Sequence, residues 1–334
     1  MTLATKPPST FALVAGLMTL YLVWGSTYLA IRVAVETLPP FLMSGCRFLV
    51  AAAIMFGWIA VARGVRFTWR QLRYNALVGA CMLLGGNGLV AWAEQEISSG
   101  VATLVVSLSP LFIVLLDWAV LGLSGGKLGD RPALLTFIGI AVGCAGLVML
   151  VGPELLPVVD SDSAAVSAAK NNLGRMLALV AACFFWAAGS LMTRYAPEPV
   201  EPFTGAALQM FWGGLWLVAA GWLMGEGVGL DVGKFTVNSL LAWGYLVIAG
   251  SLIAFTTYVW LMKHYAPAVI STYSYINPIV AVFLGWLILN ETINSRIFTA
   301  SAVIVLGVAL ITISRSRAKM KVQHAAAKAD EVRR

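Results

Sequence analysis

The chain of 334 residues has few charged side chains, and this shortage excludes an ordinary soluble protein. Asp, Glu, Lys and Arg together make up 11% of the residues, against roughly 25% in soluble domains. Hydrophobic residues make up 60%, and the mean hydropathy is +0.87. Such a sequence cannot cover a folded surface in water, so we expect its solvent to be a lipid bilayer.

Histidine and cysteine are also scarce, which removes the usual ligands and nucleophiles of an enzyme. The two histidines are His264, at the end of a predicted helix, and His324, in the C-terminal tail. The four cysteines fall inside apolar stretches without a C-x-x-C pair, so neither disulfides nor a metal site are expected. Motifs of serine hydrolases, zinc proteases and P-loop ATPases do not occur. We therefore expect no catalytic residues and no cofactor, and a membrane-embedded enzyme is the weaker alternative.

Apolar stretches of about 20 residues, long enough to cross a bilayer as helices, follow one another along the chain. We predict membrane spans at residues 11–35, 41–62, 73–93, 98–121, 131–151, 172–194, 203–224, 239–262, 267–288 and 294–314. The first is expected to be retained, because it is too long for a signal peptide and lacks an A-x-A-like cleavage site. The predicted fold class is an all-α membrane protein with ten transmembrane helices.

Basic residues concentrate on one side of these spans. With the N-terminus inside, the inner segments hold 16 Lys and Arg residues, and the outer segments hold four. Because Lys and Arg beside a span tend to stay cytoplasmic, both termini are predicted to be cytoplasmic. This sidedness accounts for the net charge of +7, so no nucleic-acid partner is expected. Residues 315–334 form a basic tail, expected to be solvated, with contact to anionic lipid as the alternative.

The polar connection 152–171 divides the spans into two sets of five, 11–151 and 172–314, which share an internal repeat. A shift of 162 residues aligns Trp24, Arg32 and Pro40 with Trp186, Arg194 and Pro202. A shift of 168 residues aligns Trp92, Pro110, Trp118 and Gly139 with Trp260, Pro278, Trp286 and Gly307. Because five is an odd number, the second set enters the membrane from the opposite side. Two inverted five-helix repeats are a recurring architecture of secondary transporters, whose substrate site lies near the midplane between them.

Polar and aromatic side chains gather on helix faces that should not contact lipid. Steps of four residues relate Trp24, Tyr28 and Arg32 on the first span, and Trp186, Ser190 and Arg194 on the sixth. The candidate substrate-binding residues are Trp24, Tyr28, Arg32, Arg47, Asn87, Glu94, Thr103, Ser107, Trp186, Ser190, Ser271, Tyr275 and Asn277. For each hydroxyl the alternative is a hydrogen bond to its own helix or to a neighbouring one.

The two arginines near the start of the chain differ in depth. Arg32 lies near the end of its span, so it either reaches the outer surface or faces the interior. Arg47 lies six residues beyond Phe41, roughly 9 Å into the bilayer, where a charge is costly. Its acidic candidates are Glu36, Glu94 and Glu96. A structural ion pair and a substrate contact remain equal alternatives.

Prolines and glycines mark further positions inside the spans. Pro110 and Pro278 lie mid-span. Because proline has no backbone N–H, Pro110 leaves the Val106 carbonyl without its helical donor, and Pro278 does the same to the Ser274 carbonyl. They indicate either a simple helix kink or a binding role. The G-x-x-x-G pairs Gly139/Gly143 and Gly221/Gly225 predict close helix packing.

The stretches "WGSTYLAIR", "PPFLMSGCRFLVAA", "GNGLVAWAEQEISSGVATLVVSLSPLF" and "YSYINPIVAVFLGWLILNET" resemble ten-helix EamA-type transporters of the drug/metabolite transporter superfamily. The likeness extends over residues 15–315. It implies a carrier in the plasma membrane, the inner membrane in bacteria, often exporting amino acids or related metabolites through a cavity between the halves. The chain departs from the pattern at Gly122 and Leu123, where members often carry an acidic pair, whereas Glu291 keeps the acid after the ninth span.

These observations predict a secondary transporter that moves a small zwitterionic or weakly polar solute by alternating access. A passive pore or a membrane-embedded sensor with the same cavity is the alternative. Glu94 and Asp117 are candidate proton carriers. The expected partners are the small-molecule substrate and the lipid bilayer, and a homodimer is left open.

Overall fold

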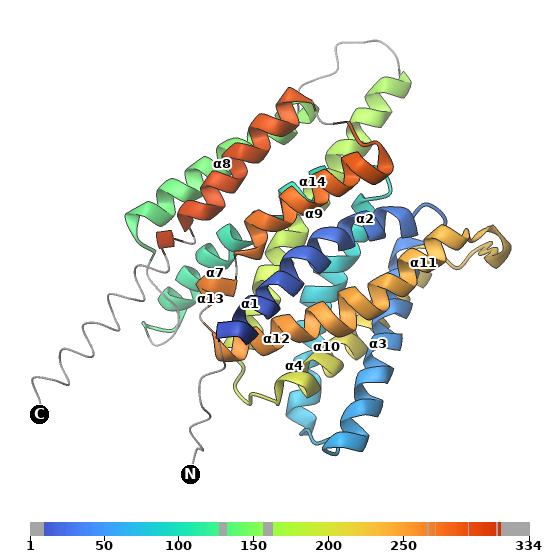
Figure 1. Cartoon of the computed structure of the whole chain (residues 1–334), viewed down its shortest axis with the longest axis vertical. Coiled ribbons are helices and arrows are strands. Elements are labelled where there is room, and N and C mark those ends of the chain that lie inside the picture. The colour runs from blue at the N-terminus through green and yellow to red at the C-terminus, as the bar shows by residue number, and fades with distance from the viewer. Residues whose placement is uncertain are drawn as a thin grey trace, which may run out of the picture.

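The computed structural model describes residues 10–126, 132–155, 163–265, 267–270, 272–292, 294–311 and 313–314, and every regular element in these ranges is a helix (Figure 1). Seven helical segments are long and apolar enough to cross a membrane: Thr10–Ala34, Pro40–Ala62, Trp69–Ala93, Ser99–Leu123, Asn172–Arg194, Pro202–Leu223 and Val237–Leu261. Three shorter apolar helices, Leu134–Met149, Ile276–Leu289 and Ser295–Ile311, fall on the other predicted spans. The all-α membrane fold is therefore confirmed.

The helical elements are, in chain order, α1 (Thr10–Thr19), η1 (Leu20–Trp24), α2 (Gly25–Ala34), α3 (Pro40–Ala62), α4 (Trp69–Gly79), η2 (Ala80–Gly88), α5 (Leu89–Ala93), α6 (Ser99–Val106), α7 (Ser109–Leu123), α8 (Leu134–Leu155), α9 (Ser163–Arg194), α10 (Pro202–Leu223), η3 (Val232–Lys234), α11 (Val237–Tyr245), η4 (Leu246–Phe255), α12 (Thr256–His264), α13 (Pro267–Ile270) and α14 (Tyr273–Leu289). The final helix is Ser295–Ile311. Within the connection 152–171, α8 continues to Leu155 and α9 begins at Ser163, while residues 156–162 lie outside the described ranges.

Three spans change from α-helical to π-helical geometry along their length. The π-helical segments are η1, η2 and η4, each continuous with the α-helices on either side of it. Under the 168-residue shift, η2 (Ala80–Gly88) falls almost on η4 (Leu246–Phe255). Short π-helical insertions are frequent at functional sites, because they alter the direction of the side chains that follow. The sequence pattern gave no sign of them.

The two mid-span prolines have different effects on their helices. Pro110 is at the start of α7, and the span is interrupted between Val106 and Ser109, so this proline marks a break rather than a kink. The hydroxyl of Ser109 donates to the Val106 carbonyl at 2.7 Å, which satisfies the acceptor that the break exposes. Pro278 instead lies inside α14, which continues past it.

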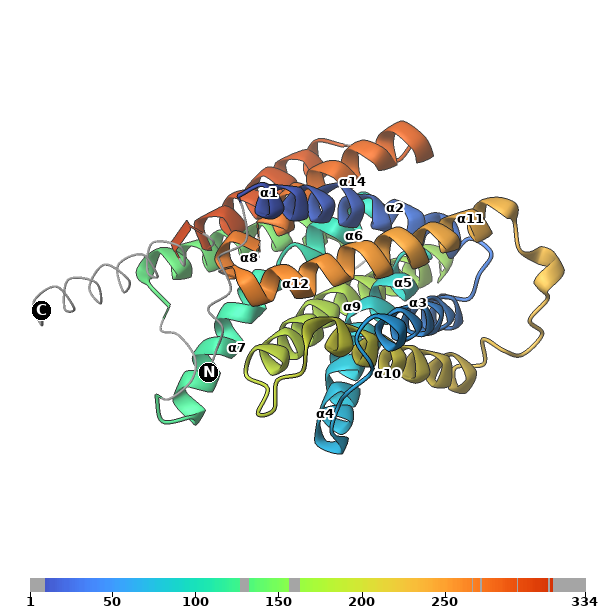
Figure 2. The same ribbon diagram turned by 60° about the horizontal axis from the view of Figure 1, so that its bottom comes forward.

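The helices pack in pairs drawn from the two halves of the chain. α3 lies along α10 (Figure 2), and α14 packs against α2 and α6. At the edge of the bundle α8 lies beside the helix Ser295–Ile311 (Figure 1). A Cβ atom on Gly139 would lie 2.8 Å from the Gly307 carbonyl oxygen, so these two helices meet at bare backbone. Close packing at Gly139 is confirmed, whereas Gly225 lies in a turn with φ of 83°.

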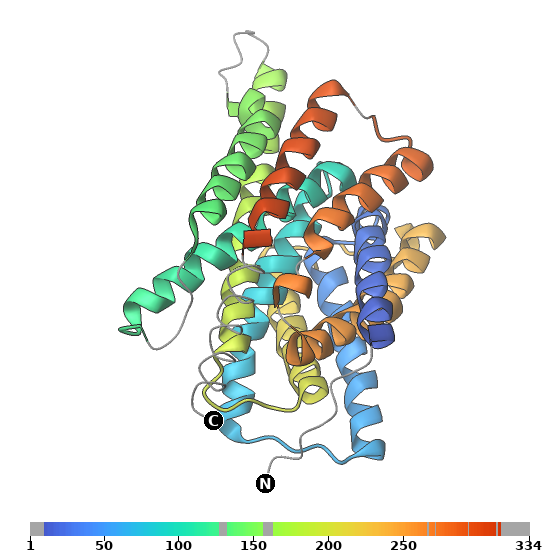
Figure 3. The same ribbon diagram turned by 60° about the vertical axis from the view of Figure 1, so that its left-hand side comes forward.

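The bundle has two ends, and each is named here after the arginine that lies at it. The Arg32 end comprises residues 35–39, 94–98 and 224–236, which connect successive spans. The Arg194 end comprises residues 63–68 and 195–201, which lie together at the lower end of the molecule in Figure 3.

Candidate functional site

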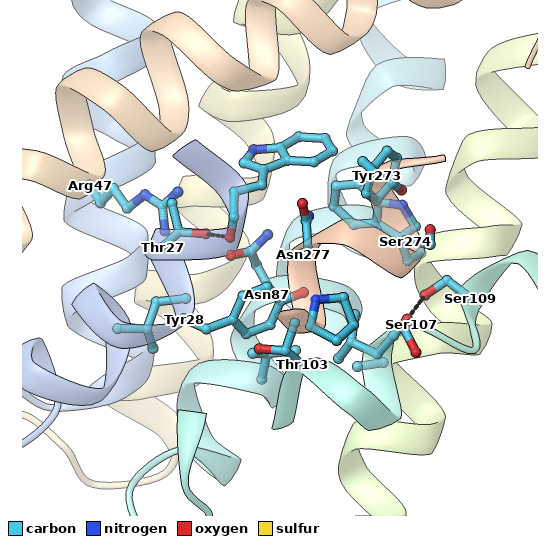
Figure 4. A pocket seen from close by; sticks show the side chains of 18 residues that line it. Thr27, Tyr28, Arg47, Asn87, Thr103, Ser107, Ser109, Tyr273, Ser274 and Asn277 are labelled. Atoms are coloured by element: carbon cyan, nitrogen blue, oxygen red, sulfur yellow. Dashed lines mark hydrogen bonds between the residues drawn. The ribbon is translucent and has the colours of Figure 1, made fainter. Parts of the chain in front are cut away.

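A central cavity lies between the two halves, lined by residues of η1, α2, α3, η2, α5, α6, α7, α9 and α14 (Figure 4). Its 18 lining residues are Trp24, Thr27, Tyr28, Ile31, Arg47, Gly86, Asn87, Val90, Thr103, Val106, Ser107, Ser109, Ala182, Trp186, Tyr273, Ser274, Asn277 and Pro278. The cavity volume of about 80 Å³ is several times the roughly 10–15 Å³ that one buried water requires. It has room for several water molecules but is narrow, and a larger solute requires its side chains to move.

Most of the predicted substrate-binding residues line this cavity. They are Trp24, Tyr28, Arg47, Asn87, Thr103, Ser107, Trp186 and Asn277. The sequence reasoning missed Thr27, Ser109, Tyr273 and Ser274. Tyr273 and Ser274 precede Asn277 by four and three residues, so helical spacing from that asparagine would have found them.

Three other candidates do not line the central cavity. Arg32 Nη1 donates to the backbone carbonyls of Glu94 and Gln95, both at 2.5 Å, at the C-terminal end of α5. The Glu94 carboxyl is fully buried, and its oxygens have no hydrogen-bond partner among the described residues. The Ser190 hydroxyl donates to the Trp186 carbonyl at 2.7 Å. Ser271 lies outside the described residues, and for Tyr275 only the backbone, within α14, is described.

Four aromatic rings form a cluster at one side of the cavity. The ring of Trp24 lies 5.9 Å from that of Trp186, its repeat counterpart, and 5.0 Å from those of Tyr258 and Tyr273. Edge-to-face pairs at such distances are favourable beyond the area they bury. We call Trp24, Trp186, Tyr258 and Tyr273 the aromatic cluster.

A second cavity, of about 400 Å³, opens at the Arg194 end. Its wall includes Tyr258 of the aromatic cluster, together with Ser190 and Arg194. A buried amide pair also contributes, in which Gln209 Nε2 donates to Asn75 Oδ1 at 3.2 Å. Since Tyr258 lines this cavity and the other three rings line the central one, the aromatic cluster separates the two spaces.

Arg47 is buried in α3, with 4% of its surface exposed. Its Nε donates to the Ser251 hydroxyl of η4 at 2.8 Å, and its guanidinium lies 4.7 Å from the Phe48 ring centre. In the described part of the chain no carboxylate lies within 4.0 Å of it, so the ion pair with Glu36, Glu94 or Glu96, one of the two alternatives for this residue, does not form. The reason is that α3 packs against η4 at this depth, where Gly250 leaves room for the guanidinium.

Besides Ser109, three Ser and Thr hydroxyl groups in the cavity wall are already used as donors. Thr103 donates to the Ser99 carbonyl and Ser107 to that of Leu104, each at 2.6 Å. Thr27 donates to the Trp24 carbonyl at 2.7 Å. The alternative that each hydroxyl bonds its own helix is therefore confirmed for these three. These three offer lone pairs to the cavity, and the donors that remain for a solute include the guanidinium of Arg47 and the amide of Asn87.

Comparison with known proteins identifies the family. The sequence profile of the EamA-like transporter family matches residues 11–152 and 173–313. The chain belongs to this family. The inner membrane transporter YedA of Escherichia coli K12 is 34% identical over 304 residues, covering 91% of each chain. The transporter YoaV of Bacillus subtilis is 23% identical over 311 residues, covering 91% of this chain and 98% of its own.

A crystal structure of a protein 23% identical in sequence superimposes with a TM-score of 0.62, covering 92% of this chain and 99% of the other. That likeness supports the fold alone. Together with the apolar helices, the family membership establishes a membrane transporter.

Two carboxylates of this EamA-like transporter bind the N-termini of helices distant in sequence. Glu291 accepts from the backbone N–H of Ser99 at 2.9 Å and of Gly100 at 3.3 Å. Glu226 accepts from the N–H of Phe41 at 3.1 Å and of Leu42 at 2.8 Å. An anion at a helix N-terminus is stabilised by the helix dipole. Both carboxylates lie at the Arg32 end, and the acid retained at Glu291 is therefore a helix cap.

Asp117 is fully buried at the Arg194 end, where α7 meets α9. Its carboxylate accepts from the Tyr195 hydroxyl at 2.6 Å and pairs with Arg194 at 3.6 Å. Asp117 lines neither cavity, so its position supports a structural pair more directly than proton transfer along the solute path.

Proposed function

We propose that this protein is a secondary transporter that exports a small metabolite, an amino acid or a related solute, by alternating access across the bacterial inner membrane. One observation carries the proposal: both halves of the chain line a central cavity with polar side chains in its wall, and the repeat-related Trp24 and Trp186 meet at its boundary. A carrier needs such a site near the midplane together with a barrier that can form on either side of it. No enzymatic step is part of the proposal.

The proposal includes ten spans arranged as two inverted five-helix repeats. Seven full-length spans and three shorter apolar helices support that number. The inversion is supported by the contact between Trp24 and Trp186, by the contact between Gly139 and Gly307, and by the matching positions of η2 and η4. The excess of basic residues supports cytoplasmic termini, which makes the Arg194 end the cytoplasmic one.

In this mechanism solute enters the Arg194-end cavity and passes into the central cavity when the rings of the aromatic cluster separate. Release on the other side requires the helix ends at the Arg32 end to part. The contacts of Glu226 and Glu291 then break and re-form once in each cycle.

The test is counterflow in proteoliposomes, with a panel of labelled amino acids and small monocarboxylates. We expect saturable counterflow for at least one of these solutes, reduced at least tenfold by Trp24→Ala combined with Trp186→Ala. Trp58→Ala is the control, because Trp58 is exposed and contacts only Phe203 and Arg63 among the described aromatic and cationic groups. Flux without saturation or counterflow would establish a pore, and binding without flux would establish a sensor.

Sidedness is tested separately by cysteine labelling at Asp160 and Ala325, which lie in the connection and in the tail. The inverted repeat places them on opposite sides of the membrane. Labelling of both from one side would contradict the arrangement of the spans.

A further inference from the structure

Arg47 is the only Lys, Arg, Asp or Glu among the 18 described residues that line the central cavity. Its Nη1 atom is buried and has no hydrogen-bond partner in the part of the chain that the structure describes. Its one hydrogen bond within the described part of the chain, from Nε to the Ser251 hydroxyl, goes to a neutral group. A buried cation is stable only when a counter-charge or enough acceptors meet it. The guanidinium therefore retains the capacity to bind a further acceptor.

Other arginines of the described spans are satisfied by the protein itself. Arg32 binds two backbone carbonyls, Arg175 binds the Trp92 carbonyl and the Gln95 side chain, and Arg194 pairs with Asp117. Arg47 lies deeper, seven residues after the start of α3 at Pro40, or about 10 Å along the helix. Its missing acceptor is thus particular to this position and not a general property of arginines in this bundle.

We propose that Arg47 binds the carboxylate of the transported solute, and that the solute class is a small monocarboxylate with an uncharged body. This inference rests on the proposed function and, among the solutes named there, selects a carboxylate without an ammonium group over an amino acid. A guanidinium presents its N–H groups as a planar fork that matches a carboxylate. The bond from Nε to Ser251 fixes the plane of that fork and leaves both terminal nitrogens without a hydrogen bond in the described part of the chain.

The remainder of the cavity wall fits an uncharged body. Figure 4 shows Arg47 and Thr27 on one side and Tyr273 and Ser274 on the other, with Asn87 and Asn277 between them. The amide of Asn87 supplies a second donor near the carboxylate position. The rings of Trp24, Trp186 and Tyr273 supply an apolar surface. An ammonium group would find no carboxylate among these lining residues and would lie in the field of Arg47.

The experiment uses four solutes that share a phenyl ring: phenylacetate, phenylacetamide, 2-phenylethylamine and phenylalanine. Binding to the purified full-length protein is measured as the concentration that gives half of the maximal thermal stabilisation, and transport is measured as counterflow. We expect phenylacetate to act at a concentration at least tenfold lower than the amide or the amine, and lower than phenylalanine. This ranking is obtained on the unmutated protein and needs no variant.

Arg47→Gln is expected to weaken phenylacetate binding at least tenfold and to abolish the preference for the acid over the amide. Arg47→Lys should retain part of that preference, because it keeps the charge without the planar fork. The matched control is Arg63→Gln, which removes an exposed arginine just beyond the C-terminus of the same helix and should leave the ranking unchanged.

Two results would overturn the inference: a wild-type preference for the amine, the amide or the zwitterion, or unchanged phenylacetate binding by Arg47→Gln. Stabilisation by chloride equal to that by phenylacetate would also overturn it, since the site would then recognise any anion. These outcomes are distinct from failure of the proposed function. Acid-selective binding that depends on Arg47, without counterflow, would overturn the carrier and support the carboxylate site.

Discussion

The two ends of the helix bundle are held together by different kinds of charged contact. At the Arg32 end, Glu226 and Glu291 bind helix N-termini, and Arg32 and Arg175 bind carbonyls at the C-terminal end of α5. Each charge has the sign that the helix dipole favours. At the Arg194 end, the pairs Arg70–Glu198 and Arg63–Glu201 join side chains, of which the arginines are 85% and 59% exposed.

This difference indicates which end opens more readily from the observed conformation. Exposed ion pairs contribute about 0–1 kcal/mol each, whereas a buried backbone group that loses a charged partner costs about 1–3 kcal/mol. The Arg32 end is therefore the firmly closed one, and the Arg194 end already contains the larger cavity. Asp117 is the exception at the Arg194 end, because it is fully buried and bonded to two side chains.

The largest effect is expected for Asp117→Asn, which tests that exception. It replaces the fully buried carboxylate that Tyr195 and Arg194 contact by a neutral amide, and we expect a loss of about 3 kcal/mol in the free energy of unfolding. Denaturant unfolding of the protein in detergent measures this loss. Tyr195→Phe, which removes only the hydroxyl, should cost about 1 kcal/mol. If Asp117→Asn lost less stability than Tyr195→Phe, the pair between Asp117 and Arg194 would contribute nothing to the stability of the Arg194 end.

Glu291→Ala tests the firm closure of the Arg32 end. The N–H groups of Ser99 and Gly100 lose their acceptor, and we expect the free energy of unfolding to fall by about 2 kcal/mol. In proteoliposomes, a thiol reagent added on the side of the Arg32 end should label a cysteine at position 103 more rapidly in this variant than in the parent protein. Unchanged stability and unchanged labelling would show that this cap does not hold the end closed.

Arg32→Ala and Arg175→Ala test whether two contacts at the Arg32 end act together, because both side chains bind the end of α5 and both contact Gln95. Each change should cost about 1–2 kcal/mol. Since they share a partner, the double variant should depart from additivity by at least about 0.5 kcal/mol. Strict additivity in the unfolding measurement would show that the two arginines act independently.

The smallest effect is expected for Arg70→Ala at the Arg194 end. Its partner Glu198 is itself partly exposed, so the change should alter the free energy of unfolding by no more than about 0.5 kcal/mol. The same unfolding assay in low and high salt measures it. A loss equal to that of Glu291→Ala would erase the difference between the ends.

The helical spans and much of the cavity wall were predictable from the sequence. Hydropathy located the apolar helices, and Trp24 and Trp186 were placed together by the internal repeat. The depth of Arg47 from the start of its helix indicated a buried arginine. These features depend on composition and on helical spacing, which the sequence contains directly.

Arg32 shows where four-residue spacing failed. At 100° per residue Arg32 lies about 80° around the helix from Trp24, whereas Ile31 lies within about 20°. Ile31 lines the cavity, and Arg32 turns to the end of α5. A face built from steps of three, four and seven residues would have included Thr27 and excluded Arg32.

The partner of Arg47 could not have been predicted in the same way. It depends on Ser251 and Gly250, which lie in the π-helical segment η4. A π-helical turn rotates every later side chain relative to an ideal α-helix, so a period of 3.6 no longer gives the facing residue. The acidic candidates came from expected sidedness, and geometry within the bundle selected a hydroxyl instead.

The contact between Gly139 and Gly307 has a consequence for assembly. It lies away from the central cavity, on helices that close each half of the chain, and a side chain at Gly307 would collide with the backbone of Gly143. A junction of this shape allows one half to recognise the other without any covalent connection. The two halves, produced as separate polypeptides divided between α8 and α9, should therefore associate and reconstitute transport. Gly307→Leu should prevent this association.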